Sequence, residues 1–168
     1  RVLNKERYIL WYDEIEQLSA DILVTKIKAM NILDPKAPIT IEIDSPGGNV
    51  AAGIAIMNAI EQSKAPITTI ITSEACSMGA MISIVGHHRK MYYNAFWMQH
   101  PISEGQVDYI NFIKDRASYL SRLESVMHNT LRKYTKLTDE DILKTQHGEL
   151  WLGAKEALAK GVVDEIIK

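Results

Sequence analysis

The feature that most constrains the fold of this chain is a repeated change in hydrophobic spacing. β-Branched and alternating apolar runs, typical of strands, exchange with apolar residues three or four apart, typical of helices. This pattern predicts strands at 8–11, 39–43, 66–71, 90–93, 96–99 and 162–167. It predicts helices from Leu18 to the Asp34-Pro35 stop, and at 49–61, 77–85, about 107–134, from 139 onward and at 154–159. Asn49 and Thr138 are the expected N-caps of two of these helices, and Gly161 is the expected stop after the last one. Such alternation without a long linker indicates an α/β fold with a mainly parallel sheet.

Length and charge narrow the functional classes. The 168 residues suit a single domain covering 1–168, and a hydrophobic fraction of 46% excludes a disordered protein. The net charge of −2 carries no electrostatic signature of nucleic-acid or membrane binding. The longest uncharged run, Ser45–Ile60, is shorter than the roughly 20 residues of a membrane span. We therefore expect neither nucleic acid nor membrane as a partner.

The single cysteine, Cys76, cannot form an internal disulfide, and no Cys/His spacing resembles a zinc site. A lone cysteine of this kind is typically a small buried hydrophobe. The sequence thus predicts no bound metal or other cofactor, and a reducing, cytoplasmic location.

Two glycine-bearing turns stand where a predicted strand meets a predicted helix. Ser45-Pro46-Gly47-Gly48 allows positive φ angles and a close approach of backbone N–H groups to a ligand. In Cys76-Ser77-Met78-Gly79-Ala80, Ser77 lies where a helix start supplies free N–H donors, which suits a nucleophile with an oxyanion beside it. An unliganded tight turn and an ordinary serine N-cap are the alternative interpretations.

A serine nucleophile needs a base, and of the five histidines His100 has the most suggestive position. It ends a predicted strand and precedes Pro101, at the sheet edge where α/β folds tend to place their sites. The other histidines are expected in a solvated turn (His87, His88), on the long helix (His128) and in a polar loop (His147).

A third group would orient the imidazole. The carboxylates beyond His100 that could do so include Asp108, Asp139, Asp141 and Glu149, and charge alone does not choose among them. The residues by themselves therefore lead only to a hypothesis of serine hydrolysis.

At these positions the sequence resembles the ClpP family, the proteolytic subunit of the Clp protease, over nearly its whole length. Ala75-Cys76-Ser77-Met78-Gly79-Ala80 is similar to the family's Ala-Ala-Ser-Met-Gly-Ala, and Met98-Gln99-His100 to its Met-Ile-His. The Ser45–Gly48 turn, the 151–157 segment and Gly161-Val162-Val163-Asp164 are similar to further family motifs. Several modest motifs in the family's order make the resemblance specific.

The resemblance implies a ClpP/crotonase-like fold, with repeated β-β-α-type units, a mainly parallel sheet and a protruding handle helix. It implies Ser77 as nucleophile, His100 as general base, Glu149 as the third residue, and the backbone N–H groups of Gly48 and Met78 as the oxyanion hole. Polypeptides would be the substrates, and the chain would assemble into heptameric rings, stacked in the family as a tetradecamer. A partner AAA+ unfoldase would use ATP, so this subunit itself would need no cofactor.

Several residues depart from the family pattern. Glu149 stands where the family has aspartate, one methylene longer, and Gly148 replaces an arginine that makes a ring-to-ring salt bridge. Thr40 and Glu42 replace aromatic residues that help the family bind its unfoldase. The segment from Pro101 to Asp108 is expected to be shorter than in the family.

Three other functions stay open at this stage. The chain could be a ring subunit without catalysis, a crotonase-like enzyme acting on acyl-CoA thioesters, or a peptidase with a Ser–Lys dyad. Replacing His100 with alanine separates a triad from a Ser–Lys dyad, because only the triad needs the imidazole.

Overall fold

The computed structural model describes residues 7–103 and 110–168 of the chain. Its strands are β1 (Tyr8–Trp11), β2 (Ile39–Ser45), β3 (Ile67–Cys76), β4 (His88–Tyr92), β5 (Phe96–Gln99), β6 (Leu150–Gly153) and β7 (Glu165–Ile167). Its helices are α1 (Gln17–Leu33), α2 (Val50–Glu61), α3 (Met78–Ile84), α4 (Ile110–Tyr134), α5 (Asp139–His147) and α6 (Ala154–Ala159). The predicted α/β architecture is confirmed. The expected start of the long helix at 107 and the candidate Asp108 lie outside the described residues.

The strands form one sheet in the order β1-β2-β3-β4-β7, all parallel, with β5 and β6 attached beside it. The attachment depends on the length of β3, which pairs with β4 through Thr68–Ile71 and with β5 through Glu74–Cys76. β6 then runs antiparallel to β5, and this is the only antiparallel pair among the described strands. The far half of β3 thereby carries Cys76 and the residue after it to the junction with β5.

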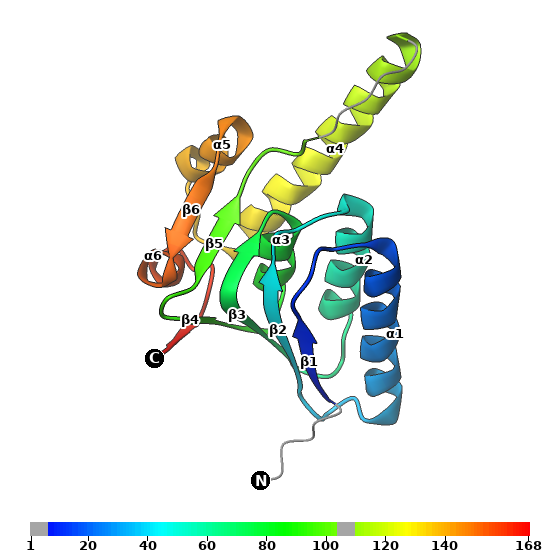
Figure 1. Cartoon of the computed structure of the whole chain (residues 1–168), viewed down its shortest axis with the longest axis vertical. Helices are drawn as coiled ribbons and strands as arrows, with labels where there is room; N and C mark the ends of the chain where they lie inside the picture. Colours follow the sequence, from blue (N-terminus) through cyan, green and yellow to red (C-terminus); the bar gives the residue numbers. More distant parts are fainter. Residues whose placement is uncertain (1–6, 104–109) are drawn as a thin grey trace.

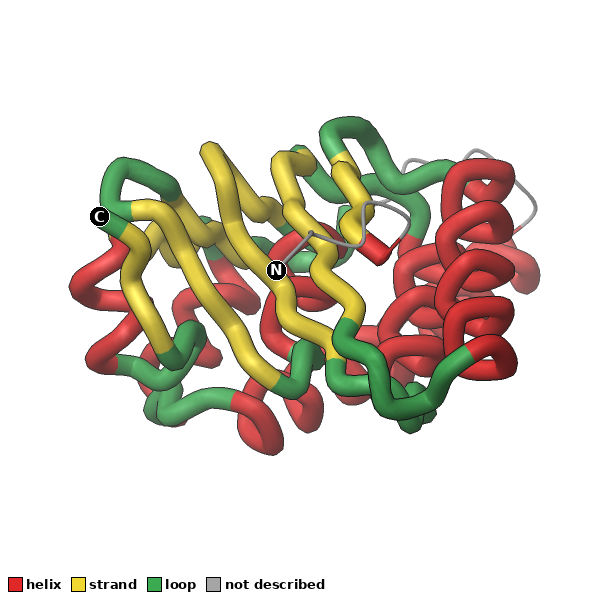
Figure 2. Tube along the Cα trace, turned by 90° about the horizontal axis from the view of Figure 1, so that it is seen from below, coloured by secondary structure: helices red, strands yellow, loops and turns green. Residues whose placement is uncertain are grey.

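Isoleucine-rich strands and small helical residues form the core. Ile39, Ile41 and Ile43 of β2 are buried toward the helices, while Thr40 and Glu42 alternate to the opposite face. Trp97 of β5 is fully buried, and its indole N–H donates to the Ala80 carbonyl of α3 (3.3 Å). Figure 2 shows the strands as a twisted layer with most of the helices on one side. The sheet therefore has a packed face, and its alternate residues lie on a second face.

Local signals explain most of the helix boundaries. The Asn49 side chain accepts a hydrogen bond from the Ala52 N–H (2.9 Å) at the start of α2, and Thr138 does the same for Asp141 at the start of α5. Gly161 adopts φ 63° after α6. These capping predictions are confirmed.

Five strands differ from the prediction. β2 ends at Ser45 rather than 43, β4 begins at His88 rather than 90, and the other three differences are larger. β3 extends five residues beyond the expected Ile71, because pairing with β5 keeps its polar second half extended. β6 was not predicted, since its short Leu150–Gly153 run is extended only through pairing with a strand about fifty residues earlier. β7 begins at Glu165 rather than Val162, because 162 and 163 are used in backbone hydrogen bonds to the end of α6.

α4 is the most protruding element. Figure 1 shows its first turns extending beyond the rest of the chain, while its last turns lie against the body. The buried Met127 and Leu131 belong to the packed end, whereas Phe112 is exposed toward the tip. No helix among the described residues is long and apolar enough to cross a membrane.

Candidate active site

Ser77 stands between β3 and α3 in a backbone conformation that is uncommon for a side-chain-bearing residue. Its φ is 53° and its ψ −121°, and it is the one non-glycine residue of the described chain with a positive φ. Its N–H donates to the Met98 carbonyl of β5 (2.9 Å), which fixes it at the β3–β5 junction. The side chain makes no capping hydrogen bond to α3. Ser77 therefore occupies the N-cap position of α3 without the side-chain hydrogen bond that an ordinary serine N-cap makes.

The Gly47-Gly48 turn lies directly against Ser77. A Cβ added to Gly47 would come within 2.7 Å of the Ser77 Cβ and 3.1 Å of the Met78 nitrogen, and Gly47 has φ 102°. Gly48, with φ 140°, is held by a parallel bridge to Ile15. Ile15 donates its N–H to the Gly47 carbonyl and accepts from the Asn49 N–H, both at 2.7 Å. Glycine is required here by positive φ and by contact with the serine.

Two backbone N–H groups beside Ser77 remain unused. Within the described part of the chain, neither the Gly48 nor the Met78 amide donates a hydrogen bond to a backbone or side-chain oxygen. Met78 is the first residue of α3, so its amide is one of the donors that a helix start leaves unpaired. Unpaired amides next to a serine are the groups that stabilise the oxyanion formed in acyl transfer.

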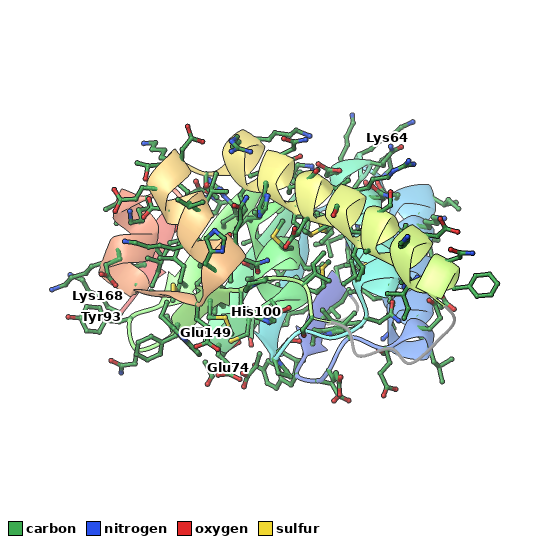
Figure 3. The ribbon with its side chains drawn as sticks, turned by 90° about the horizontal axis from the view of Figure 1, so that it is seen from above. Lys64, Glu74, Tyr93, His100, Glu149 and Lys168 are labelled. Atoms are coloured by element: carbon green, nitrogen blue, oxygen red, sulfur yellow. The ribbon has the colours of Figure 1, made fainter. Side chains whose placement is uncertain are left out.

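His100 and Glu149 are brought to the same place by the β5–β6 pair. Gln99 pairs with Leu150, so His100 follows and Glu149 precedes the last registered pair. Figure 3 shows His100 and Glu149 next to each other, as the register of β5 and β6 requires. Since β5 also pairs with the end of β3, the tertiary structure gathers Ser77, His100 and Glu149 at one junction.

The described side chains of Ser77, His100 and Glu149 do not make the hydrogen bonds of a catalytic triad. Across residues 7–103 and 110–168, no hydrogen bond joins Ser77 to His100 or His100 to Glu149. The Glu149 side chain is exposed, and its Oε2 accepts a hydrogen bond from the Trp151 indole (2.7 Å). A rotation of these side chains would be needed to connect them.

The other candidate acids and bases are engaged elsewhere. Asp139 pairs with Arg132, and Asp141 with Lys160. His87 and His88 are exposed as expected, yet His87 accepts a hydrogen bond from the Ile67 N–H and His88 contacts Glu165. His128 is half-buried on α4, where burial lowers its pKa, and His147 ends α5 rather than lying in a loop. Position alone therefore separates His100 from the other histidines.

The charge around the serine is negative. Burial raises the pKa of the adjacent Cys76 thiol to about 11, with further contributions from Glu74, Glu149 and Asp44. The thiol is therefore protonated near neutral pH and unsuited to act as a nucleophile. The sequence analysis did not single out Asp44 and Glu74. Their positions near the ends of two neighbouring parallel strands could have indicated that both lie close to the site.

A cavity of about 260 Å³ opens beside the glycine turn. It lies between the first turn of α2, the segment after His100, and α4. Its walls combine apolar side chains with Arg116 and Tyr119. No group of three or more metal-ligating side chains occurs among the residues that the structure describes.

Comparison with known proteins agrees with this geometry. The family model described as Clp protease matches residues 1–168. The chain is also 31% identical over 169 residues to the ATP-dependent Clp protease proteolytic subunit of Leuconostoc citreum strain KM20. That match covers 98% of this chain and 84% of the relative.

Proposed function

Because the chain belongs to the Clp protease family, we propose that it is a serine endopeptidase that hydrolyses unfolded polypeptides or short peptides through an acyl-enzyme on Ser77. The conformation of Ser77 is the observation that carries the proposal. A positive φ in a non-glycine residue costs of order 1–3 kcal/mol and concentrates at functional sites. Here it occurs in a serine whose side chain makes no capping hydrogen bond and which lies against a glycine turn.

The proposed reaction uses each neighbouring group in turn. His100 takes the hydroxyl proton as Ser77 Oγ bonds to the substrate carbonyl carbon, and the Gly48 and Met78 N–H groups stabilise the oxygen that becomes negative. The carbon–nitrogen bond then breaks as His100 gives its proton to the leaving amine. A water molecule cleaves the acyl ester by the same route, releasing the new carboxyl end and restoring Ser77. Glu149 orients His100 and stabilises its cation.

The proposed working form is an assembly. We expect heptameric rings that enclose the serines, with unfolded chains delivered by an AAA+ partner that uses ATP. The family-specific ring-to-ring salt bridge cannot form at Gly148, so stacking into a tetradecamer would have to depend on other contacts. We expect the hydrogen bonds from Ser77 to His100 and from His100 to Glu149 to form on assembly or on substrate binding.

The open side-chain contacts favour one alternative, a ring subunit without catalysis. Covalent labelling separates the two. A fluorophosphonate forms a phosphorus–oxygen bond with an activated serine and releases fluoride. Intact mass should show one adduct on the natural chain, and it should disappear in Ser77→Ala and His100→Ala.

Matched controls use residues outside the site. Ser73→Ala, on the exposed part of β3, and His88→Ala, on β4, should label as fast as the natural chain. Glu149→Gln should slow labelling by about tenfold or more, because the imidazolium loses its counter-charge. An adduct that persists in Ser77→Ala would overturn the assignment of the nucleophile. No adduct on the natural chain in its assembled form would favour the non-catalytic ring subunit.

A further inference from the structure

Glu149, the proposed third residue of the site, has a hydrogen-bond partner outside the triad. Its Oε2 accepts a hydrogen bond from the indole N–H of Trp151, with 2.7 Å between oxygen and nitrogen. Glu149 immediately precedes β6 and Trp151 is the second residue of that strand, so the two are spaced like residues that share a face. A hydrogen bond to an ionised acceptor is shorter and stronger than one between neutral groups. The indole is therefore placed to hold the carboxylate.

His100 lies on the same side of the β5–β6 pair. Gln99 is directly opposite Leu150 in this antiparallel pair, so the register continues with His100 opposite Glu149. Directly opposite residues project their side chains from one face, with their Cβ atoms about 5 Å apart. Figure 3 shows His100 and Glu149 as neighbours. Trp151, Glu149 and His100 are therefore consecutive groups on one face of the pair.

One oxygen of the Glu149 carboxylate stays available to the imidazole. An ionised carboxylate accepts through both of its oxygens, and the Trp151 indole uses only Oε2. Within the described part of the chain, nothing donates a hydrogen bond to Oε1. His100 can therefore turn its ring toward Oε1 while the indole keeps Oε2.

The length of the glutamate side chain gives this contact a purpose. Glutamate has one methylene more than the aspartate of a Ser-His-Asp triad, which adds about 1.5 Å and one rotatable bond. The Glu149 side chain is exposed, so few neighbours limit its rotation. Each additional rotamer lowers the fraction of time that the carboxylate spends beside the imidazole. An anchor on one oxygen removes most of that freedom.

We propose that Trp151 is a positioning residue for this reaction. Its indole N–H anchors the long Glu149 side chain, so that the second carboxylate oxygen is presented to His100. Trp151 acts through Glu149 and not on the reacting atoms. The inference rests on the proposed function, because it assumes that Glu149 orients the base that activates Ser77.

Trp151→Phe removes the indole N–H and keeps an aromatic ring at a half-exposed position. The rate of fluorophosphonate labelling of Ser77 should fall about fivefold, which is the scale of one hydrogen bond. Trp11→Phe is the matched control. It removes an indole N–H that has no acceptor among the described residues, so this variant should label at the natural rate.

Shortening the carboxylate separates positioning from packing. Glu149→Asp withdraws the oxygen from the indole by about 1.5 Å, which is enough to break a hydrogen bond of 2.7 Å. Adding Trp151→Phe to Glu149→Asp or to Glu149→Ala should then change the labelling rate by less than about twofold. An equal loss on adding Trp151→Phe to the natural chain and to both variants would show that the ring contributes by packing, and would overturn the positioning role.

The indole resonances test the contact without any reaction. The chain has three tryptophans, and the signal that is missing from Trp151→Phe identifies the Trp151 indole N–H in a nitrogen–proton correlation spectrum. Glu149→Ala should move this signal to a lower proton frequency, because the hydrogen bond to the carboxylate is lost. The signals of Trp11 and Trp97 should stay in place.

The outcomes separate this inference from the proposed function. Equal or faster labelling in Trp151→Phe, or an indole signal that does not respond to Glu149→Ala, would overturn the role of Trp151 and leave the peptidase assignment intact. Failure of the assembled natural chain to label at Ser77 would overturn the peptidase assignment, and the inference with it.

Discussion

At the scale of single residues, the site depends on a serine and a glycine that share one small volume. Ser77 takes up a strained backbone angle, and Gly47 leaves the space into which its Cβ fits. Gly79 makes a second close approach, because a Cβ there would lie 3.0 Å from the Ser45 carbonyl oxygen. The two turns recognised separately in the sequence are thus parts of one packed unit.

Gly47→Ala should damage this unit in two ways. The added methyl would lie 2.7 Å from the Ser77 Cβ, and alanine at φ 102° is strained whatever the space. We expect the free energy of unfolding to fall by about 2 kcal/mol, and fluorophosphonate labelling to be lost even in the folded fraction. Thermal denaturation and intact mass measure the two effects.

Gly148→Ala is the control for that variant. Its φ of −176° is ordinary extended backbone, and an added Cβ would meet nothing closer than 4.0 Å. Stability and labelling should be close to those of the natural chain. Normal labelling in Gly47→Ala would show that the turn does not need to touch Ser77 for reactivity.

At the scale of elements, the divided pairing of β3 decides where the site forms. Its first half belongs to the parallel sheet and its second half pairs with β5, which in turn pairs with β6. Three segments far apart in sequence, ending near Ser77, His100 and Glu149, therefore meet. α5 precedes β6, so its fixed position also contributes to where Glu149 lies.

The buried Asp141 fixes the start of α5, and its charge links stability to pH. It accepts hydrogen bonds from Thr138 (3.0 Å) and from Lys160 (2.6 Å). Burial opposes its ionisation, but these hydrogen bonds outweigh burial and keep its pKa below the ordinary value. A lowered pKa stabilises the fold above the unfolded pKa of about 3.9, and the contribution disappears as pH falls through the folded pKa.

Asp141→Asn should therefore lower the free energy of unfolding by about 2 kcal/mol at neutral pH, with a smaller effect as the pH falls below the unfolded pKa of about 3.9. Urea denaturation at several pH values measures this dependence. Asp139→Asn, which changes an exposed partner of Arg132, should shift stability by less than about 1 kcal/mol. An equal loss for Asp141→Asn at pH 7 and at the acid extreme would contradict the role of its charge.

At the scale of the whole molecule, Arg89 connects the sheet to the two helical regions around it. From β4 its guanidinium donates to the Tyr134 carbonyl at the end of α4 and to the Gly161 carbonyl after α6 (2.9 Å). It also pairs with Asp164 before β7. The Arg89 side chain is only 14% exposed. If the guanidinium were removed, water could therefore replace its hydrogen bonds only poorly.

Arg89→Met preserves the stem and removes these hydrogen bonds. We expect it to lower the free energy of unfolding by about 3 kcal/mol, because one change takes the donor from two partly buried carbonyls and takes the guanidinium from Asp164, which keeps the Arg89 backbone N–H. Arg132→Met, at a pair with both partners at least half exposed, should cost less than about 1 kcal/mol. Equal denaturation midpoints for the two variants would contradict the connecting role of Arg89.

The sequence alone was sufficient for the α/β class, for the helix caps at Asn49 and Thr138, and for the proximity of Ser77 and the glycine turn to strand ends. These properties depend on local periodicity and capping chemistry, which neighbouring residues determine. The tertiary structure alone decided that β3 reaches Cys76, that β6 is a strand, and that Arg116 lines a cavity beside Gly48. Each of these depends on pairing or packing between distant segments, and a period read along one segment contains no information about its partner.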